Sequence, residues 1–223
     1  MAIAKRLAAE FIGTALLLAI GSGAGIAAQR LAGGDDALAL LVSALVGATG
    51  LAVLILAFGS ISGGLFNPVL TLSEAWRGAL RADHVVPYIA VQGAGAVAGV
   101  AAVHGMYGLD LMIAAQHVRT GAGPWLGEFV ATFGLLCVFI GCGRSRPVVA
   151  PFAVSAYVMA ACWFSSSSAF MNPALTLARA IGEAGALRPV DVPAFVLAQL
   201  AGAGAATALF IWLHGPARGA VRT

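Results

Sequence analysis

Two Asn-Pro triplets, Asn67-Pro68-Val69 and Asn172-Pro173-Ala174, each open an apolar stretch much shorter than the ~20 residues that cross a bilayer. Asparagine is a strong helix N-cap, and proline at the first helical position removes one unpaired N–H donor. The triplets therefore predict two short helices, about 67–77 and 172–182. A single Asn-Pro usually starts a helix at a water interface. Two in matching surroundings predict half-helices that begin inside a bilayer and meet head to head.

The composition is that of a membrane protein. The chain is 61% hydrophobic and 9% charged, whereas a soluble domain carries about 25% charged residues. Its net charge of +3 does not indicate a nucleic-acid partner, because Lys and Arg in membrane proteins mostly set topology. We therefore expect an all-α membrane protein with two re-entrant half-helices and six transmembrane helices. The predicted spans are 6–29, 37–58, 85–106, 124–142, 148–164 and 192–214.

The chain also repeats itself. Three pairs of segments resemble each other in the same order: 9–14 and 127–132, 66–72 and 171–177, and 92–96 and 199–203. We interpret residues 1–223 as a single channel domain made of one repeat near 1–106 and another near 124–214. Each repeat has an odd number of spanning helices, so the second is expected to be inverted relative to the first.

Positive charge predicts the topology. With both termini in the cytoplasm, more cationic residues lie in the cytoplasmic segments than in the outer segments, in agreement with the positive-inside rule. Eight lie inside and four outside: Lys5, Arg6, Arg77, Arg81, Arg144, Arg146, Arg218 and Arg222, against Arg30, Arg119, Arg179 and Arg188. The two half-helices then enter from opposite faces of the bilayer.

The loops before the triplets, 60–66 and 165–171, are expected to be non-helical. Such backbone is tolerated in a membrane only where it lines a cavity or is buried in protein. Facing helix starts place positive dipole ends at the centre, which repel cations and protons. We expect the amides of Asn67 and Asn172 to donate to a passing solute. The loop backbone expected to line the pore is that of Gly64, Leu65, Phe66, Ser168 and Phe170.

Two carboxylates lie within predicted spans. Glu10 and Glu128 occupy equivalent repeat positions, and such groups are costly in a membrane unless protein satisfies them. They either accept hydrogen bonds from the re-entrant loops or relay protons, and their equivalence favours the structural role. Gln92 and Gln199 are expected to brace the same loops. The glycine pairs 21/25 and 95/99 are predicted helix contacts.

These motifs together resemble the aquaporin and aquaglyceroporin family of major intrinsic proteins, over nearly the whole chain. The resemblance implies a homotetramer in the bacterial inner membrane, with one pore per subunit for water or small uncharged solutes. It implies no cofactor, no metal and no enzymatic activity. The four histidines are scattered without a paired nucleophile or metal-ligand spacing.

The sequence departs from the family pattern at two positions. Val69 replaces the usual alanine, and Leu175 replaces an arginine that forms the charged part of the family's filter. By the family's spacing the remaining filter residues are Ala160, Ala169 and either Gly47 or Thr49. This filter is wide and uncharged. Cys162 is interpreted as a small buried residue or, alternatively, as a pore-facing thiol.

Segment 163–171 resembles a bacterial subgroup that is associated with arsenic resistance. The sequence-based hypothesis is a wide channel for arsenite or related metalloid acids, with glycerol and water as further solutes. The alternatives are a water-selective channel and a proton-coupled secondary transporter, which also uses inverted repeats and broken helices.

Overall fold

The computed structural model describes residues 2–111, 114–182 and 185–214, and these form a helical bundle. Arg218 and Arg222, which entered the charge count, lie outside the described residues. The elements are α1 (Ile3–Leu31), α2 (Asp36–Ser62), α3 (Pro68–Trp76), α4 (Ala82–Tyr107), α5 (Ala122–Ser145), α6 (Ala150–Phe164), α7 (Pro173–Ala178), a 3₁₀ turn η1 (Pro189–Asp191) and α8 (Val192–His214).

The helical membrane fold is confirmed. Among the described residues, α1, α2, α4, α5 and α8 are long and apolar enough to cross a membrane. The predicted crossing at 148–164 is the short helix α6, which has 15 residues. At 1.5 Å per residue it spans roughly 22 Å, less than the ~30 Å hydrocarbon core.

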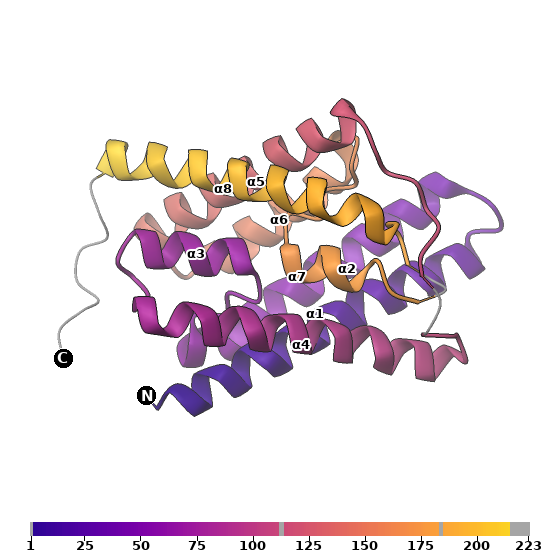
Figure 1. Ribbon diagram of the computed structural model, residues 1–223, viewed down its shortest axis with the longest axis horizontal. Helices are drawn as coiled ribbons and strands as arrows, with labels where there is room; N and C mark the ends of the chain where they lie inside the picture. Colours follow the sequence, from indigo (N-terminus) through magenta and orange to yellow (C-terminus); the bar gives the residue numbers. More distant parts are fainter. Residues whose placement is uncertain (1, 112–113, 183–184, 215–223) are drawn as a thin grey trace.

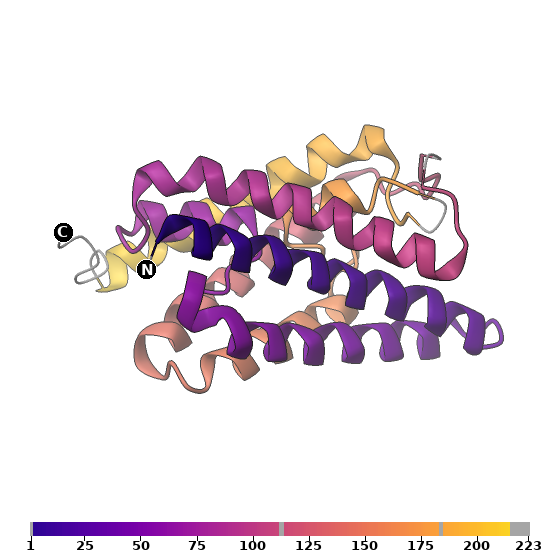
Figure 2. The same cartoon turned by 90° about the horizontal axis from the view of Figure 1, so that it is seen from below.

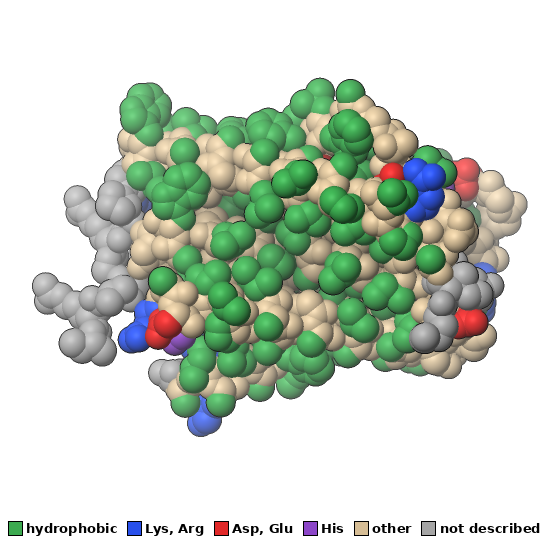
Figure 3. Space-filling model, in the orientation of Figure 1, with side chains coloured by type: hydrophobic (Ala, Val, Ile, Leu, Met, Phe, Trp, Pro, Cys, Tyr) green, Lys and Arg blue, Asp and Glu red, His purple; other side chains and the backbone are tan. Residues whose placement is uncertain are grey.

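The two halves of the bundle use the same helix contacts. Helix α1 packs on α2 and α4, and α5 packs in the same way on α6 and α8. Helix α2 joins the halves by packing on α6. The start of α1 and the end of α8 lie at the same end of the bundle (Figures 1 and 2). Hydrophobic side chains cover the middle of the face in Figure 3, and charged side chains gather at its two ends.

The half-helices α3 and α7 begin at the two prolines, as predicted. Helix α7 ends at Ala178, however, and does not reach the predicted end at 182. The helix ends there because the carbonyls that follow it accept hydrogen bonds from residues outside the helix. The carbonyl of Arg179 accepts from the N–H groups of Ala186 and Leu187, at 2.9 and 3.3 Å, and that of Ala180 accepts from Ala115.

Close helix packing depends on glycines. A Cβ atom at Gly95 would lie 2.5 Å from the carbonyl oxygen of Phe11, and one at Gly99 would lie 2.1 Å from that of Ala15. These glycines therefore let α4 approach the backbone of α1, which confirms the predicted contact. Gly202 gives α8 the same close approach to α5.

The prediction for Gly21 and Gly25 is wrong. Within 4 Å, a Cβ atom built at either position would meet only a guanidinium nitrogen of Arg179 and no backbone of another helix.

Replacing Gly99 by alanine is expected to destabilise the protein, because the new methyl group would press on the α1 backbone. The cost should be about 1–3 kcal/mol, typical of overpacking. Gly93→Ala, on the same helix, is the matched control, since a Cβ atom there meets nothing within 4 Å. Thermal unfolding of the purified variants measures the difference, and equal midpoints for the two would contradict this packing.

Candidate functional site

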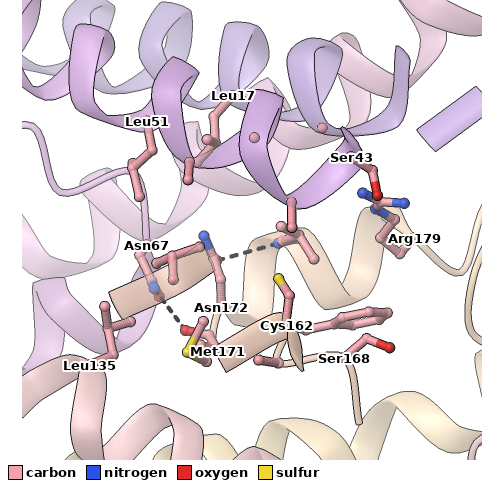
Figure 4. Close-up of a pocket in the computed structure, with 18 of the residues that line it drawn as sticks. Leu17, Ser43, Leu51, Asn67, Leu135, Cys162, Ser168, Met171, Asn172 and Arg179 are labelled. Carbon is pink, nitrogen blue, oxygen red and sulfur yellow. Dashed lines mark hydrogen bonds between the residues drawn. The ribbon is translucent and has the colours of Figure 1, made fainter. Parts of the chain in front are cut away.

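An elongated cavity of about 350 Å³ runs through the bundle. Its wall follows α2 from Asp36 to Ile55, a length of roughly 28 Å at 1.5 Å per residue. Helices α1, α5, α6 and α7 and both re-entrant loops complete the wall (Figure 4). The cavity is therefore long enough to cover most of the thickness of a hydrocarbon core.

The two half-helices meet at this cavity through their capping asparagines. The side-chain oxygen of Asn67 accepts from the N–H of Val69 at 3.0 Å, and that of Asn172 accepts from Ala174 at 3.0 Å. Each amide nitrogen donates to the opposite loop. Asn67 Nδ2 donates to the carbonyl of Met171 at 2.8 Å (Figure 4), and Asn172 Nδ2 donates to that of Phe66 at 2.9 Å.

These crossed bonds alter the expected role of the asparagines. The sequence predicts that the amides of both residues donate to a passing solute. The opposite carbonyl takes one N–H of each amide, and an amide has two donors. One N–H of each asparagine therefore remains for a molecule in the cavity.

Glu10 holds the first re-entrant loop. Its carboxylate accepts from the N–H groups of Leu65 and Phe66, at 3.0 and 2.7 Å, and from the Ser62 hydroxyl at 2.6 Å. Gln92 Nε2 donates to the same carboxylate at 2.8 Å and to a threonine of α3. The carboxylate is fully buried.

Glu128 makes the corresponding contacts in the second half. It accepts from the N–H groups of Phe170 and Met171, at 2.8 and 2.9 Å, and from Gln199 Nε2 at 2.7 Å. Gln199 Nε2 also donates to Thr176 of α7 at 2.8 Å. Both carboxylates therefore accept enough hydrogen bonds to explain their burial without a proton relay.

The loops that these carboxylates hold are strained. Phe66 and Met171, which precede the two asparagines, have φ of 49° and 50°, and Ser168 and Ala169 have φ of 63° and 49°. A left-handed conformation costs a residue other than glycine of the order of 1–3 kcal/mol. The hydrogen bonds from the carboxylates offset this cost and fix the loop backbone.

The expected loop residues line the cavity: Gly64, Leu65, Phe66, Ser168 and Phe170. Val69 is fully buried beneath the wall, and Pro68, Pro173 and Ala174 also lie outside the lining. Of the expected filter residues, Gly47, Ala169 and Leu175 line the cavity.

Two of the predicted filter residues are misplaced. Thr49 is exposed, and its hydroxyl donates to carbonyls of its own helix. Ala160 is also exposed on α6. Residues two positions apart point about 200° apart around a helix. Of the two alternatives on α2, Gly47 therefore lines the cavity and Thr49 does not, and on α6 Cys162 lines it in place of Ala160.

Two arginines that the sequence analysis placed in outer segments also line the cavity. Arg119, from the loop before α5, donates to the carbonyls of Ser167 and Ala186 and to the hydroxyl of Ser168 at 2.9–3.0 Å. Burial lowers the pKa of its guanidinium, an effect that the charge of Glu128 opposes. Arg179, the C-cap residue of α7, is the second arginine.

Comparisons with known proteins point to one family. Residues 1–147 match the family described as Major intrinsic protein. The chain is 41% identical to aquaglyceroporin AqpS of Rhizobium meliloti (strain 1021), over 99% of this chain and 94% of that protein. It is 30% identical to aquaporin A of Dictyostelium discoideum, over 79% and 68% of the two chains. The solved structure of the aquaglyceroporin from Plasmodium falciparum superposes with a TM-score of 0.72 at 19% identity, covering 94% of this chain and 96% of that one.

Glu10→Gln is expected to lower stability by about 1–3 kcal/mol, because one loop N–H loses its buried acceptor. Asp83→Asn serves as the control, since its pair with Arg81 is exposed and such pairs contribute little. Thermal unfolding of both variants provides the measurement. A Glu10→Gln protein that is as stable as the control, but loses proton-gradient-dependent uptake, would favour the relay instead.

Proposed function

This chain belongs to the major intrinsic protein family, and from that membership we propose that the cavity between its two asparagine-capped half-helices is the solute path. The protein is a passive membrane channel for water, glycerol and other small uncharged solutes, and it is not an enzyme. We further propose that arsenite and related metalloid acids are among its solutes. At neutral pH arsenite is an uncharged trihydroxy molecule and therefore resembles a small polyol.

The observation that carries this proposal is the wall around Leu175. Leu175, Gly47 and Ala169 present no charged group and little side-chain bulk to the cavity. Beside these three residues, the remaining N–H of each capping asparagine and the loop carbonyls offer hydrogen bonds to the hydroxyl groups of a solute. A wall of this kind favours compact, hydroxylated solutes that are wider than water.

The proposal extends to assembly and topology. We infer a homotetramer in the bacterial inner membrane, with one solute path in each subunit and both termini in the cytoplasm. Large apolar side chains such as Leu56, Val53 and Trp212 are exposed on the bundle surface, where lipid or a neighbouring subunit covers them. The start of α1 and the end of α8 lie at the same end of the bundle (Figure 1), which supports placing both termini on one side of the membrane.

A proton-coupled transporter is the main rival, and its chemistry requires a titratable group at the solute site. Glu10 and Glu128 are fully buried and hydrogen-bonded to the loops. Neither forms part of the cavity lining, and the carboxylate that does, Asp36, is exposed at the first residue of α2, away from the half-helix starts. This placement supports passive conduction.

Leu175→Arg is expected to narrow the path and to suppress the larger solutes first. Stopped-flow measurements on proteoliposomes should show arsenite and glycerol permeability falling by about tenfold or more, a barrier increase of about 1.4 kcal/mol, with a smaller loss for water. Leu175→Met, which nearly conserves volume and adds no charge, should leave these ratios unchanged. Unchanged selectivity in Leu175→Arg would rule out this position as the filter.

A further inference from the structure

The guanidinium of Arg179 lies on the cavity wall without a protein partner. No described residue accepts a hydrogen bond from it, and its buried Nε is among the unpaired polar atoms of the described chain. No described carboxylate forms a salt bridge with it either. Arg179 is half-buried, with its Nε fully buried. A charge that is partly removed from water without a partner is costly, so binding of a ligand from solution is favourable here.

The surroundings of Arg179 fix its backbone and leave its two terminal nitrogens free of side-chain cover on the α1 side. Its own carbonyl is fixed by the N–H groups of Ala186 and Leu187. On the α1 side, Cβ atoms built at Gly21 and Gly25 would lie 3.4 Å from Nη2 and 4.0 Å from Nη1. Because both positions are glycines, no side chain covers the guanidinium there. Ser43 of α2 lines the same cavity (Figure 4), but its hydroxyl donates to carbonyls of its own helix.

Arg119 adds a second positive charge to the same wall. The two arginines share Ala186, whose N–H donates to the Arg179 carbonyl and whose carbonyl accepts from Arg119 Nε. Their charges repel each other. Asp36 also lines the cavity, but it forms no salt bridge with either arginine within the described chain. The repulsion is therefore not relieved by a carboxylate contact.

We propose that Arg179, with Arg119 beside it, forms a binding site for small oxyanions in the cavity. A planar guanidinium presents paired N–H donors that match two oxygens of a carboxylate or a phosphate. Arg119 uses several donors to hold the second loop, so Arg179 supplies the free ones. Because the site lies on the solute path, a bound oxyanion slows the passage of neutral solutes. This second effect rests on the proposed channel function, whereas binding itself does not.

The binding test uses the purified full-length protein and two probes, sodium formate and inorganic phosphate. Isothermal titration at pH 7 and constant ionic strength should show saturable binding of at least one probe to the wild type. Arg179→Gln should weaken that binding by about tenfold or more, since it removes the positive charge and the paired N–H donors of the guanidinium. Absence of saturable binding to the wild type, or equal binding to the variant, would overturn the proposal.

Two further variants separate a lost site from a damaged fold. Arg30→Gln removes an exposed arginine that does not line the cavity, so its binding should equal that of the wild type. Arg179→Lys keeps the charge but removes the paired donors, so it should bind with intermediate affinity. A thermal unfolding midpoint close to that of the wild type is required for each. Equal loss of binding in Arg30→Gln would also contradict the site.

The flux test measures glycerol entry into proteoliposomes with and without the anion that binds. The anion should slow glycerol entry through the wild type and through Arg30→Gln, and it should not change glycerol entry through Arg179→Gln. Binding without any slowing would overturn the blocking effect, while leaving the site itself in place. If the wild type conducts no glycerol at all, the proposed channel function fails, and the titration still decides whether the site exists.

Discussion

Two buried carboxylates, Glu10 and Glu128, hold the parts of this protein that lipid cannot support. A helix that begins inside a membrane leaves N–H groups unpaired, and hydrocarbon offers no acceptor. Each carboxylate binds two successive loop N–H groups just before a capping asparagine. The strained loops, the facing half-helices and the crossed asparagine bonds all depend on these contacts. The cavity can exist because the loop N–H groups beside it are hydrogen-bonded to carboxylates on its protein side.

Much of the fold is readable from the sequence because its signals are local. Each Asn-Pro motif predicts where a half-helix begins, and the order of Glu, Asn-Pro and Gln segments recurs in both halves. The crossed bonds between Asn67 and Met171, and between Asn172 and Phe66, join residues far apart in the chain. No local pattern encodes them. The early end of α7 likewise depends on bonds made by later residues.

The filter residues show a second limit of prediction from sequence, which is the direction in which a helical side chain points. Spacing located Gly47, Ala169 and Leu175, which line the cavity. It also assigned Thr49 and Ala160 to the filter, but a helix turns through about 100° per residue, and both residues, two positions away from lining residues, are exposed instead. Arg179 looked like an ordinary charge at a membrane boundary. Only the turn after α7 and the glycines of α1 direct it toward the cavity. The path thus combines an uncharged wall at Leu175 with a cation one helical turn farther along the chain.

The most direct test of passive conduction is the dependence of glycerol and arsenite entry on concentration, measured by stopped flow in proteoliposomes against protein-free vesicles. A channel predicts initial rates that rise linearly with solute concentration and do not change with an imposed proton gradient. Rates that saturate and follow the gradient would contradict the account and identify a coupled transporter.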